Sequence, residues 1–155
     1  MGRGHLSLLA AVFLVLAGAA SVAAAGTIPW RVAARGTATG VSPRAPLAIL
    51  ATSRVAARRI AADVPADAAR VALGVDYRTS LLLGVFGPFG CKDGRVRVTG
   101  VVERGRTLVV HLLVRPLPPG AAECLAIFPT FRLLVVPRSA PARLPTTAAV
   151  TVAGA

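Results

Sequence analysis

The chain has 155 residues, of which 55% are hydrophobic and 5% aromatic, and its formal net charge is +12 at pH 7. This length predicts one domain with a single modest core behind an N-terminal leader, and no second domain is expected. Of the 18 basic residues 17 are Arg and one is Lys92, and they are spread through the whole chain. Because few aromatic residues lie among them, we expect no specific nucleic-acid partner.

The first 25 residues have the pattern of a secretory signal peptide. Arg3 precedes an apolar block, LSLLAAVFLVL at 6–16, and small residues follow as far as Ala23-Ala24-Ala25. This pattern predicts cleavage before Gly26 and a secreted, periplasmic or cell-envelope protein without a transmembrane segment. The mature net charge is then +11. An uncleaved anchor is the alternative, because 6–25 are 20 residues without a charge.

Apolar periodicity divides the mature chain into short strands and helices, which Gly and Pro residues separate. Thr52 or Ser53 can cap a helix that Pro65 ends. The run LLLGVF at 81–86 is apolar on both faces and bounded by Gly87-Pro88, so we expect a fully buried central strand. In chain order we expect a weakly alternating segment at 30–36, a strand at 47–50, helices at 53–62 and 66–70, and extended segments at 81–86, 95–103, 107–115, 125–128 and 131–136.

The segments 95–103 and 107–115 predict a β-hairpin whose register follows from matching faces. A two-residue loop pairs Arg97 with Leu112 and mixes apolar and polar faces, so we expect a three-residue loop at 104–106. The expected pairs are then Val102 with Leu108, Gly100 with Val110, Val98 with Leu112 and Val96 with Val114. The polar face carries Arg95, Arg97, Thr99, Glu103 and His111.

Together these elements predict a mainly β, α+β domain over 26–138, a compact antiparallel and sandwich-like structure with one or two short helices. Residues 116–122 are Pro-rich and predict a loop. Residues 139–155 show no clear periodicity, so we expect a disordered or loosely attached tail, with an edge strand at 146–152 as the alternative.

Cys91 and Cys124 are the two cysteines of the chain, and they flank the predicted hairpin. Export makes a disulfide between them the expected state. It would close a loop of roughly 33 residues and contribute about 3–4 kcal/mol in the chain-entropy model. Two reduced core cysteines are the alternative. A zinc site needs more ligands than the one mature histidine supplies, so we expect no metal.

No set of residues predicts catalysis, and we expect neither an enzyme nor a cofactor. His111 lies in the middle of a strand, and the chain has no nucleophile-elbow motif. Gly84, Gly87 and Gly90 lack the context of a phosphate loop, because Pro88 interrupts it. The six acidic residues lie in loops or beside an Arg, and no pair stands out: Asp63, Asp67, Asp76, Asp93, Glu103 and Glu123.

Four motifs follow one another in this chain: PLAILATSRVAARRIAA, VDYRTSLLLGVFG, the hairpin RVRVTGVVERGRTLVVHLLVRP and FPTFRLLVVPR. Their order resembles the PrcB C-terminal domain, a family of bacterial envelope and secreted proteins named for an accessory subunit of a surface protease complex. The resemblance covers 30–138 and departs from the family pattern at 90–94 and 128–131. It implies a compact, non-enzymatic β-rich domain that associates with other proteins. The residues that carry it are Val75, Asp76, Tyr77, Gly84, Gly87, Pro129 and Phe131.

We therefore expect a secreted or envelope-associated, non-catalytic protein-binding domain that serves as an accessory to an exported enzyme. The alternative is an Arg-rich domain that binds polyanions or the cell surface. Its candidate binding residues are Arg95, Arg97, Arg104 and Arg106. In either case we expect weak electrostatic contact with anionic surfaces.

Overall fold

The computed structural model describes residues 26–116, 118–120 and 128–154, with the backbone alone for 91–93. The predicted signal segment and Cys124 lie outside these residues. The elements are β1 (Arg31–Thr37), β2 (Leu47–Ala51), α1 (Arg54–Ala61), α2 (Ala66–Gly74), β3 (Ser80–Gly87), the 3-10 helix η1 (Gly90–Arg95), β4 (Val96–Arg104), β5 (Thr107–Val114), β6 (Thr130–Pro137) and β7 (Thr147–Gly154).

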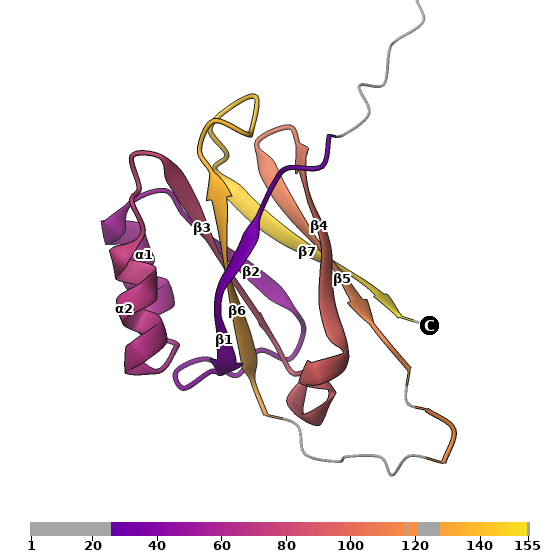
Figure 1. Ribbon diagram of the computed structural model, residues 1–155. Helices are drawn as coiled ribbons and strands as arrows, with labels where there is room; N and C mark the ends of the chain where they lie inside the picture. Colours follow the sequence, from indigo (N-terminus) through magenta and orange to yellow (C-terminus); the bar gives the residue numbers. More distant parts are fainter. Residues whose placement is uncertain (1–25, 117, 121–127, 155) are drawn as a thin grey trace, which may run out of the picture.

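The elements form three layers (Figure 1). A four-stranded antiparallel sheet, in the order β1-β6-β3-β2, packs one face against the two helices and the other against a three-stranded sheet, in the order β4-β5-β7. The prediction of a mainly β, α+β domain is confirmed. Among the described residues, no helix is long and apolar enough to cross a membrane.

The central strand of the four-stranded sheet is β3, which pairs with β6 on one side and β2 on the other. Leu81 and Leu83 face the three-stranded sheet, while Leu82 and Phe86 face the helices, and all four side chains are fully buried. A strand covered on both faces has a nearly continuous run of apolar side chains rather than an alternating one. The prediction of a fully buried central strand is therefore confirmed.

The predicted first helix is confirmed as α1. The Ser53 hydroxyl caps it by accepting a hydrogen bond of 3.2 Å from the backbone N–H of Ala56. Ile60, the fully buried residue of the last turn, packs onto β3 over Gly84. A Cβ at Gly84 would lie 3.1 Å from two carbons of Ile60, so the absence of a side chain lets α1 approach the sheet closely. The second helix, α2, extends to Gly74, beyond the predicted end.

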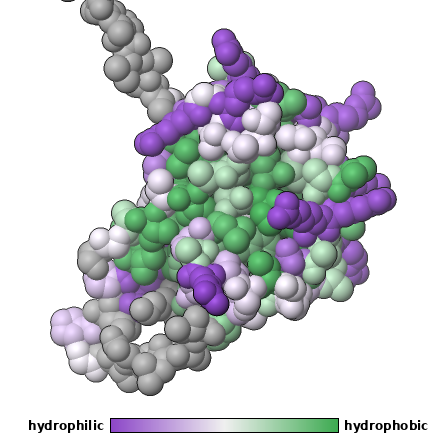
Figure 2. Space-filling model, turned by 180° about the vertical axis from the view of Figure 1, so that it is seen from behind, coloured by the Kyte–Doolittle hydropathy of each residue, from purple (hydrophilic) through white to green (hydrophobic). Residues whose placement is uncertain are grey.

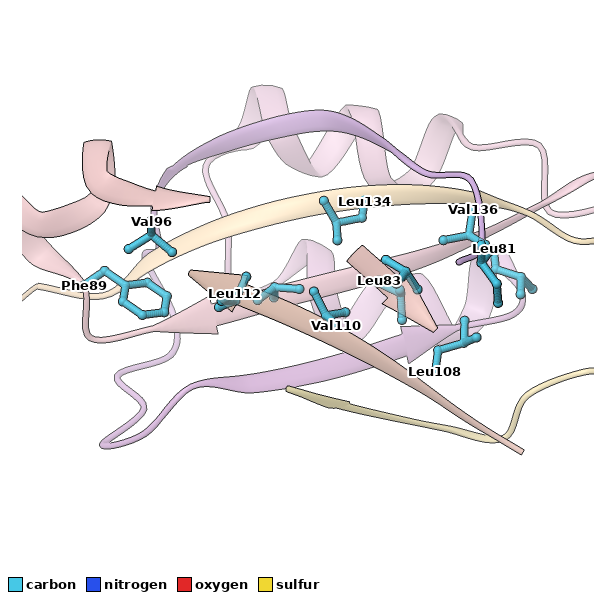
Figure 3. Packing of buried hydrophobic residues seen from close by; sticks show 12 residues of the cluster. Leu81, Leu83, Phe89, Val96, Leu108, Val110, Leu112, Leu134 and Val136 are labelled. Atoms are coloured by element: carbon cyan, nitrogen blue, oxygen red, sulfur yellow. The ribbon is translucent and has the colours of Figure 1, made fainter. Parts of the chain in front are cut away.

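The core between the two sheets is built from aliphatic side chains of their central strands. Leu108, Val110 and Leu112 of β5 point toward the four-stranded sheet (Figure 3). They meet Leu83 and Leu134, which point back from β3 and β6. This alternation of inward and outward side chains is the period-2 pattern that the hairpin sequence predicted.

The hairpin register corrects the predicted three-residue loop. Arg104 pairs with Thr107 around a two-residue turn, in which Gly105 has a φ of +62°. Such turns match the twist of paired strands and favour Gly at the first central position. Next to the turn the strands pair as Glu103 with Leu108 and Val102 with Val109. The predicted pairs of Val102 with Leu108 and Gly100 with Val110 are therefore wrong.

A β-bulge reconciles the short turn with the apolar pattern. The register shifts between Val98 and Gly100, so Thr99 has no partner residue in the ladder. Beyond the bulge the predicted pairs of Val98 with Leu112 and Val96 with Val114 are confirmed. The extra residue shifts the alternation of side chains by one position in the part of β4 between the bulge and the turn. The side chain of Glu103 therefore points inward rather than outward.

The strand β7 corrects the expectation of a disordered or loosely attached tail at 139–155. It pairs in parallel with β5, from Thr107 opposite Thr147 to Val114 opposite Gly154. The chain before β7 is held by the Glu103 carboxylate, which accepts hydrogen bonds from the backbone N–H groups of residues 142 and 143 at 2.7 and 3.2 Å. The inward turn of Glu103 at the bulge is what makes these bonds possible.

Candidate functional site

One side of the sandwich is open, because the N-terminal strand leaves one sheet and joins the other. Before Pro29 the chain pairs with β4: Thr27 bridges to Val102, and the Ile28 N–H donates to the Val101 carbonyl at 2.8 Å. From Arg31 onward it pairs with β6 as β1. The strands β1 and β4 are thus joined at one end and separate toward the other (Figure 1).

We call the cleft between β1 and β4 the seam. It has a volume of about 330 Å³. Three arginines from three different strands surround it, together with an indole and aliphatic side chains. The residues that define the seam are Trp30, Val32, Arg35, Arg97, Val98 and Arg132.

Arg132 forms the floor of the seam. It lies in the middle of β6 with 3% of its surface exposed. Its Nη2 donates a hydrogen bond of 3.1 Å to the Val96 carbonyl of β4, and its Cζ lies 5.7 Å from the centroid of the Phe89 ring. Hydrogen bonding and the cation–π contact hold the guanidinium in place between the two sheets.

Two more arginines line the edges of the seam. Arg35 on β1 lies directly opposite Arg132 in the β1–β6 register, so the two side chains share one face of the sheet. Arg97 comes from β4, on the other side of the cleft, and both Arg35 and Arg97 are exposed. Like charges directly opposite each other destabilise a sheet, and a bound anion offsets that repulsion. The geometry therefore suits a carboxylate or another anion.

Apolar groups lie among these cations. Trp30 is half-buried at the joined end of the seam, and Val32 beside it is 44% exposed. Val98 contributes a half-buried side chain from β4. Guanidinium groups combined with an indole and aliphatic carbons fit an acidic ligand that also carries apolar surface.

The four hairpin arginines predicted as a binding patch lie at two ends of the hairpin. Arg104 and Arg106 are exposed at the turn, whereas Arg97 is seven residues away along β4, about 23 Å at 3.3 Å per residue. Arg95 is half-buried, and its Nη1 donates to the Arg115 carbonyl at 3.1 Å. Of the four, only Arg97 lies in the seam.

The other residues discussed from the sequence have structural contacts. Nδ1 of His111 lies 2.6 Å from the Thr151 hydroxyl of β7, and the Thr99 hydroxyl donates to the His111 carbonyl. No group of three or more His, Cys, Asp or Glu side chains that could hold a metal ion occurs in the described part of the chain. Backbone and side-chain hydrogen bonds from Arg78 and Thr79 lower the pKa of Asp76.

The disulfide between Cys91 and Cys124 stays a prediction, because Cys124 and the side chain of Cys91 lie outside the described residues. The end of the hairpin nearest in sequence to the two cysteines is held together by a backbone hydrogen bond. The Arg115 N–H donates to the Arg95 carbonyl at 3.0 Å, so the chain segments that lead to the two cysteines leave the same end of the hairpin.

The seam was not predicted, although two of its residues carry a signal in the sequence. Arg132 interrupts the apolar run FRLLVV, and a charged residue inside a buried strand is rare enough to mark a special position. Trp30 is the single tryptophan of the chain and follows Pro29. Neither signal shows that Arg35 and Arg97 would join them.

No protein-family model, no curated protein and no solved structure matches this chain. The resemblance to the PrcB C-terminal domain therefore stays a prediction. Several residues on which the resemblance depends have structural contacts. Gly84 lets α1 pack close to the sheet, the Asp76 carboxylate accepts a hydrogen bond from the backbone N–H of Arg78, and the Tyr77 hydroxyl donates to the Ala72 carbonyl at 2.7 Å.

Proposed function

We propose that this chain is an exported, non-catalytic domain that binds another protein and takes an acidic, extended segment of that partner in the seam. The observation that carries the proposal is that Arg35, Arg97 and Arg132 all line one cleft, with Arg97 on the edge strand β4. Export rests on the signal pattern of the first 25 residues. The resemblance to an accessory-subunit family supports the binding role.

The shape of the seam favours an extended ligand. The strands β1 and β4 are the edges of their two sheets and face each other across it. An extended segment laid between them can form backbone hydrogen bonds with a strand edge and place alternate side chains toward the two walls. Carboxylates on the segment then reach the exposed guanidinium groups of Arg35 and Arg97, where paired N–H donors bind them in a bidentate manner.

The apolar residues of the seam distinguish a protein ligand from a simple polyanion. A phosphate or uronate polymer has little apolar surface, so Trp30 and Val32 would gain nothing from contact with it. A peptide that alternates acidic and apolar residues satisfies both kinds of group at once.

Trp30 supplies a direct reporter for the test, because it is the single tryptophan and is half-buried in the seam. Synthetic peptides that alternate Glu with Val or Phe are titrated against the purified chain at physiological ionic strength. Matched peptides carry Gln in place of Glu. We expect the Glu peptides to change the Trp30 emission and the Gln peptides to leave it unchanged.

Two charge-reversed double variants of equal net charge locate the binding. The variant Arg35→Glu with Arg97→Glu changes the seam, and Arg58→Glu with Arg59→Glu changes the exposed arginines of α1. We expect the seam variant to weaken peptide binding at least about tenfold, since hydrogen bonds to charged groups contribute roughly 1.5–3 kcal/mol each. An equal loss in both variants, or no binding of the Glu peptides, would overturn the proposal.

Polyanion binding is the second candidate, and one observation favours it. Arg104 and Arg106 are exposed at the hairpin turn and border an open depression with Arg143. If they bind a polyanion, the logarithm of the affinity for polyphosphate falls steeply with the logarithm of salt concentration. Replacing both by Ala should then lower that slope by about two. Unchanged binding after all four hairpin arginines, Arg95 and Arg97 included, become Ala would exclude this candidate.

A further inference from the structure

Within the part of the chain that the structure describes, β7 is an edge strand of the three-stranded sheet. Its eight residues, TAAVTVAG, contain no charge and no proline, and their register with β5 runs without a bulge. Residues 151–154 are all exposed, and Val152 is 44% exposed. A long, uncharged and regular edge strand pairs readily with another strand, and natural proteins usually prevent such pairing.

Each of the other three sheet edges of the described structure has a feature that limits pairing along its full length. The strand β4 has a bulge at Thr99 and is partly covered by the chain at 27–28. The strand β1 carries Arg31 and Arg35 and a register shift after Val32. The strand β2 has five residues only. None of these features occurs on β7.

The two strands on this side of the three-stranded sheet are uncharged, and the nearby arginines lie at the hairpin turn, where β7 begins. Figure 2 shows the side of the molecule on which β2 and β7 lie: apolar residues gather in the middle, and hydrophilic residues lie above, below and to the right of them. The strands β5 and β7 contain no Arg, Lys, Asp or Glu. In a mature chain with a net charge of +11, this side is where two copies meet with the least like-charge repulsion.

We propose that β7 pairs with β7 of a second copy, in an antiparallel arrangement around a two-fold axis. The two three-stranded sheets then become one continuous sheet of six strands. Charge determines the direction. Thr147 begins β7 beside the hairpin turn, where its N–H donates to the Arg106 carbonyl, and Arg104 and Arg143 are close by. Antiparallel pairing keeps these arginines of the two copies apart, whereas parallel pairing would bring them together.

The strand-pairing proposal is independent of the seam, which lies between the opposite edges of the two sheets. Two-fold pairing along β7 leaves β1 and β4 open, so one dimer has two seams. A dimer without peptide binding, or peptide binding without a dimer, therefore distinguishes the two proposals.

Sedimentation equilibrium of the purified chain, as the cell exports it, tests the pairing. We expect a dimer whose fraction rises with concentration across the micromolar range. Val152→Lys places two ammonium groups near the two-fold axis and should produce a monomer. Val55→Lys introduces the same charge at an exposed position of α1, 71% exposed, and should leave the dimer intact.

Hydrogen exchange of the unaltered chain keeps the test decisive even if a variant fails to fold. We expect the amides of β7 to exchange more slowly as the concentration rises, while those of β3 do not change. A monomer at every concentration, a dimer that Val152→Lys leaves intact, or a β7 whose protection is independent of concentration would overturn the proposal. A monomer whose β7 is captured by a foreign peptide strand would overturn it as well.

Discussion

The contact between Gly84 and α1 leads to a sharp prediction for Gly84→Ala. An added Cβ would lie 3.0 Å from Cε2 of Phe86 and 3.1 Å from both Cδ1 and Cγ1 of Ile60. Carbon atoms in favourable contact are about 3.5–4.0 Å apart. Because Ile60 is fully buried on a capped helix, either the helix moves outward or side chains leave their preferred rotamers.

The expected free-energy change combines two opposing terms. Overpacking of a well-packed core costs about 1–3 kcal/mol. Replacing a glycine in the interior of a strand by alanine raises the free energy of unfolding by about 0.5–1 kcal/mol. We therefore expect a net destabilisation of up to about 2.5 kcal/mol and a fall in Tm of about 3–4 °C for each kcal/mol. Urea unfolding of the purified chain measures the free energy directly.

A double-mutant cycle with Ile60→Ala isolates the contact. Ile60→Ala alone removes both crowded carbons and should cost about 2–5 kcal/mol. In that background Gly84→Ala fills part of the cavity and should be neutral or stabilising. The in-strand control is Gly100→Ala, where no atom lies within 4 Å of the added Cβ. If Gly84→Ala is as mild as this control and adds to Ile60→Ala within about 0.5 kcal/mol, the packing argument is wrong.

Four further outcomes are expected. Ser53→Ala should cost about 1 kcal/mol in urea unfolding, because it removes the cap of α1, and Ser53→Asp should restore most of it. Glu103→Gln removes the charge that two backbone N–H groups before β7 donate to, so β7 amides should exchange faster while those of β3 do not. Burial raises the pKa of Tyr77 from 10.0 to about 12, so its contribution to stability is complete below pH 10 and is lost as the pH rises through 12. Alkaline unfolding should therefore be shallower for Tyr77→Phe, and an identical pH profile would contradict this origin. Finally, the intact mass of the exported chain should rise by two hydrogens on reduction, because Cys91 and Cys124 form a disulfide. Two free thiols before reduction would refute the bridge.

Local sequence pattern was sufficient to predict the central strand, the first helix and part of the hairpin. The central strand followed from an apolar run between Gly and Pro residues, and the first helix from Ser53 and its spaced apolar positions. The far half of the hairpin register also followed, because inward and outward side chains must match across paired strands. These features depend on backbone propensity and on period, which a short window of sequence contains.

The turn half of the hairpin depended on a feature that the alternation of residues does not reveal. A bulge adds one residue to one strand, so it permits the two-residue turn at Gly105 and still aligns Val98 with Leu112. The energetic preference for that turn outweighed the regular pairing that the pattern favoured. Glu103 changed faces as a consequence and came to hold the chain before β7.

Tertiary structure decided between a disordered tail and the alternative edge strand for β7, and it alone formed the seam. Thr147–Gly154 consists of small and β-branched residues with a weak period, and it becomes a strand because β5 offers an edge to it. Arg35, Arg97 and Arg132 are far apart in sequence and line one cleft because β1 joins β6 while β4 belongs to the other sheet. The period of a sequence indicates which side chains of a strand face inward. Which strands pair, however, determines which side chains from distant parts of the chain become neighbours.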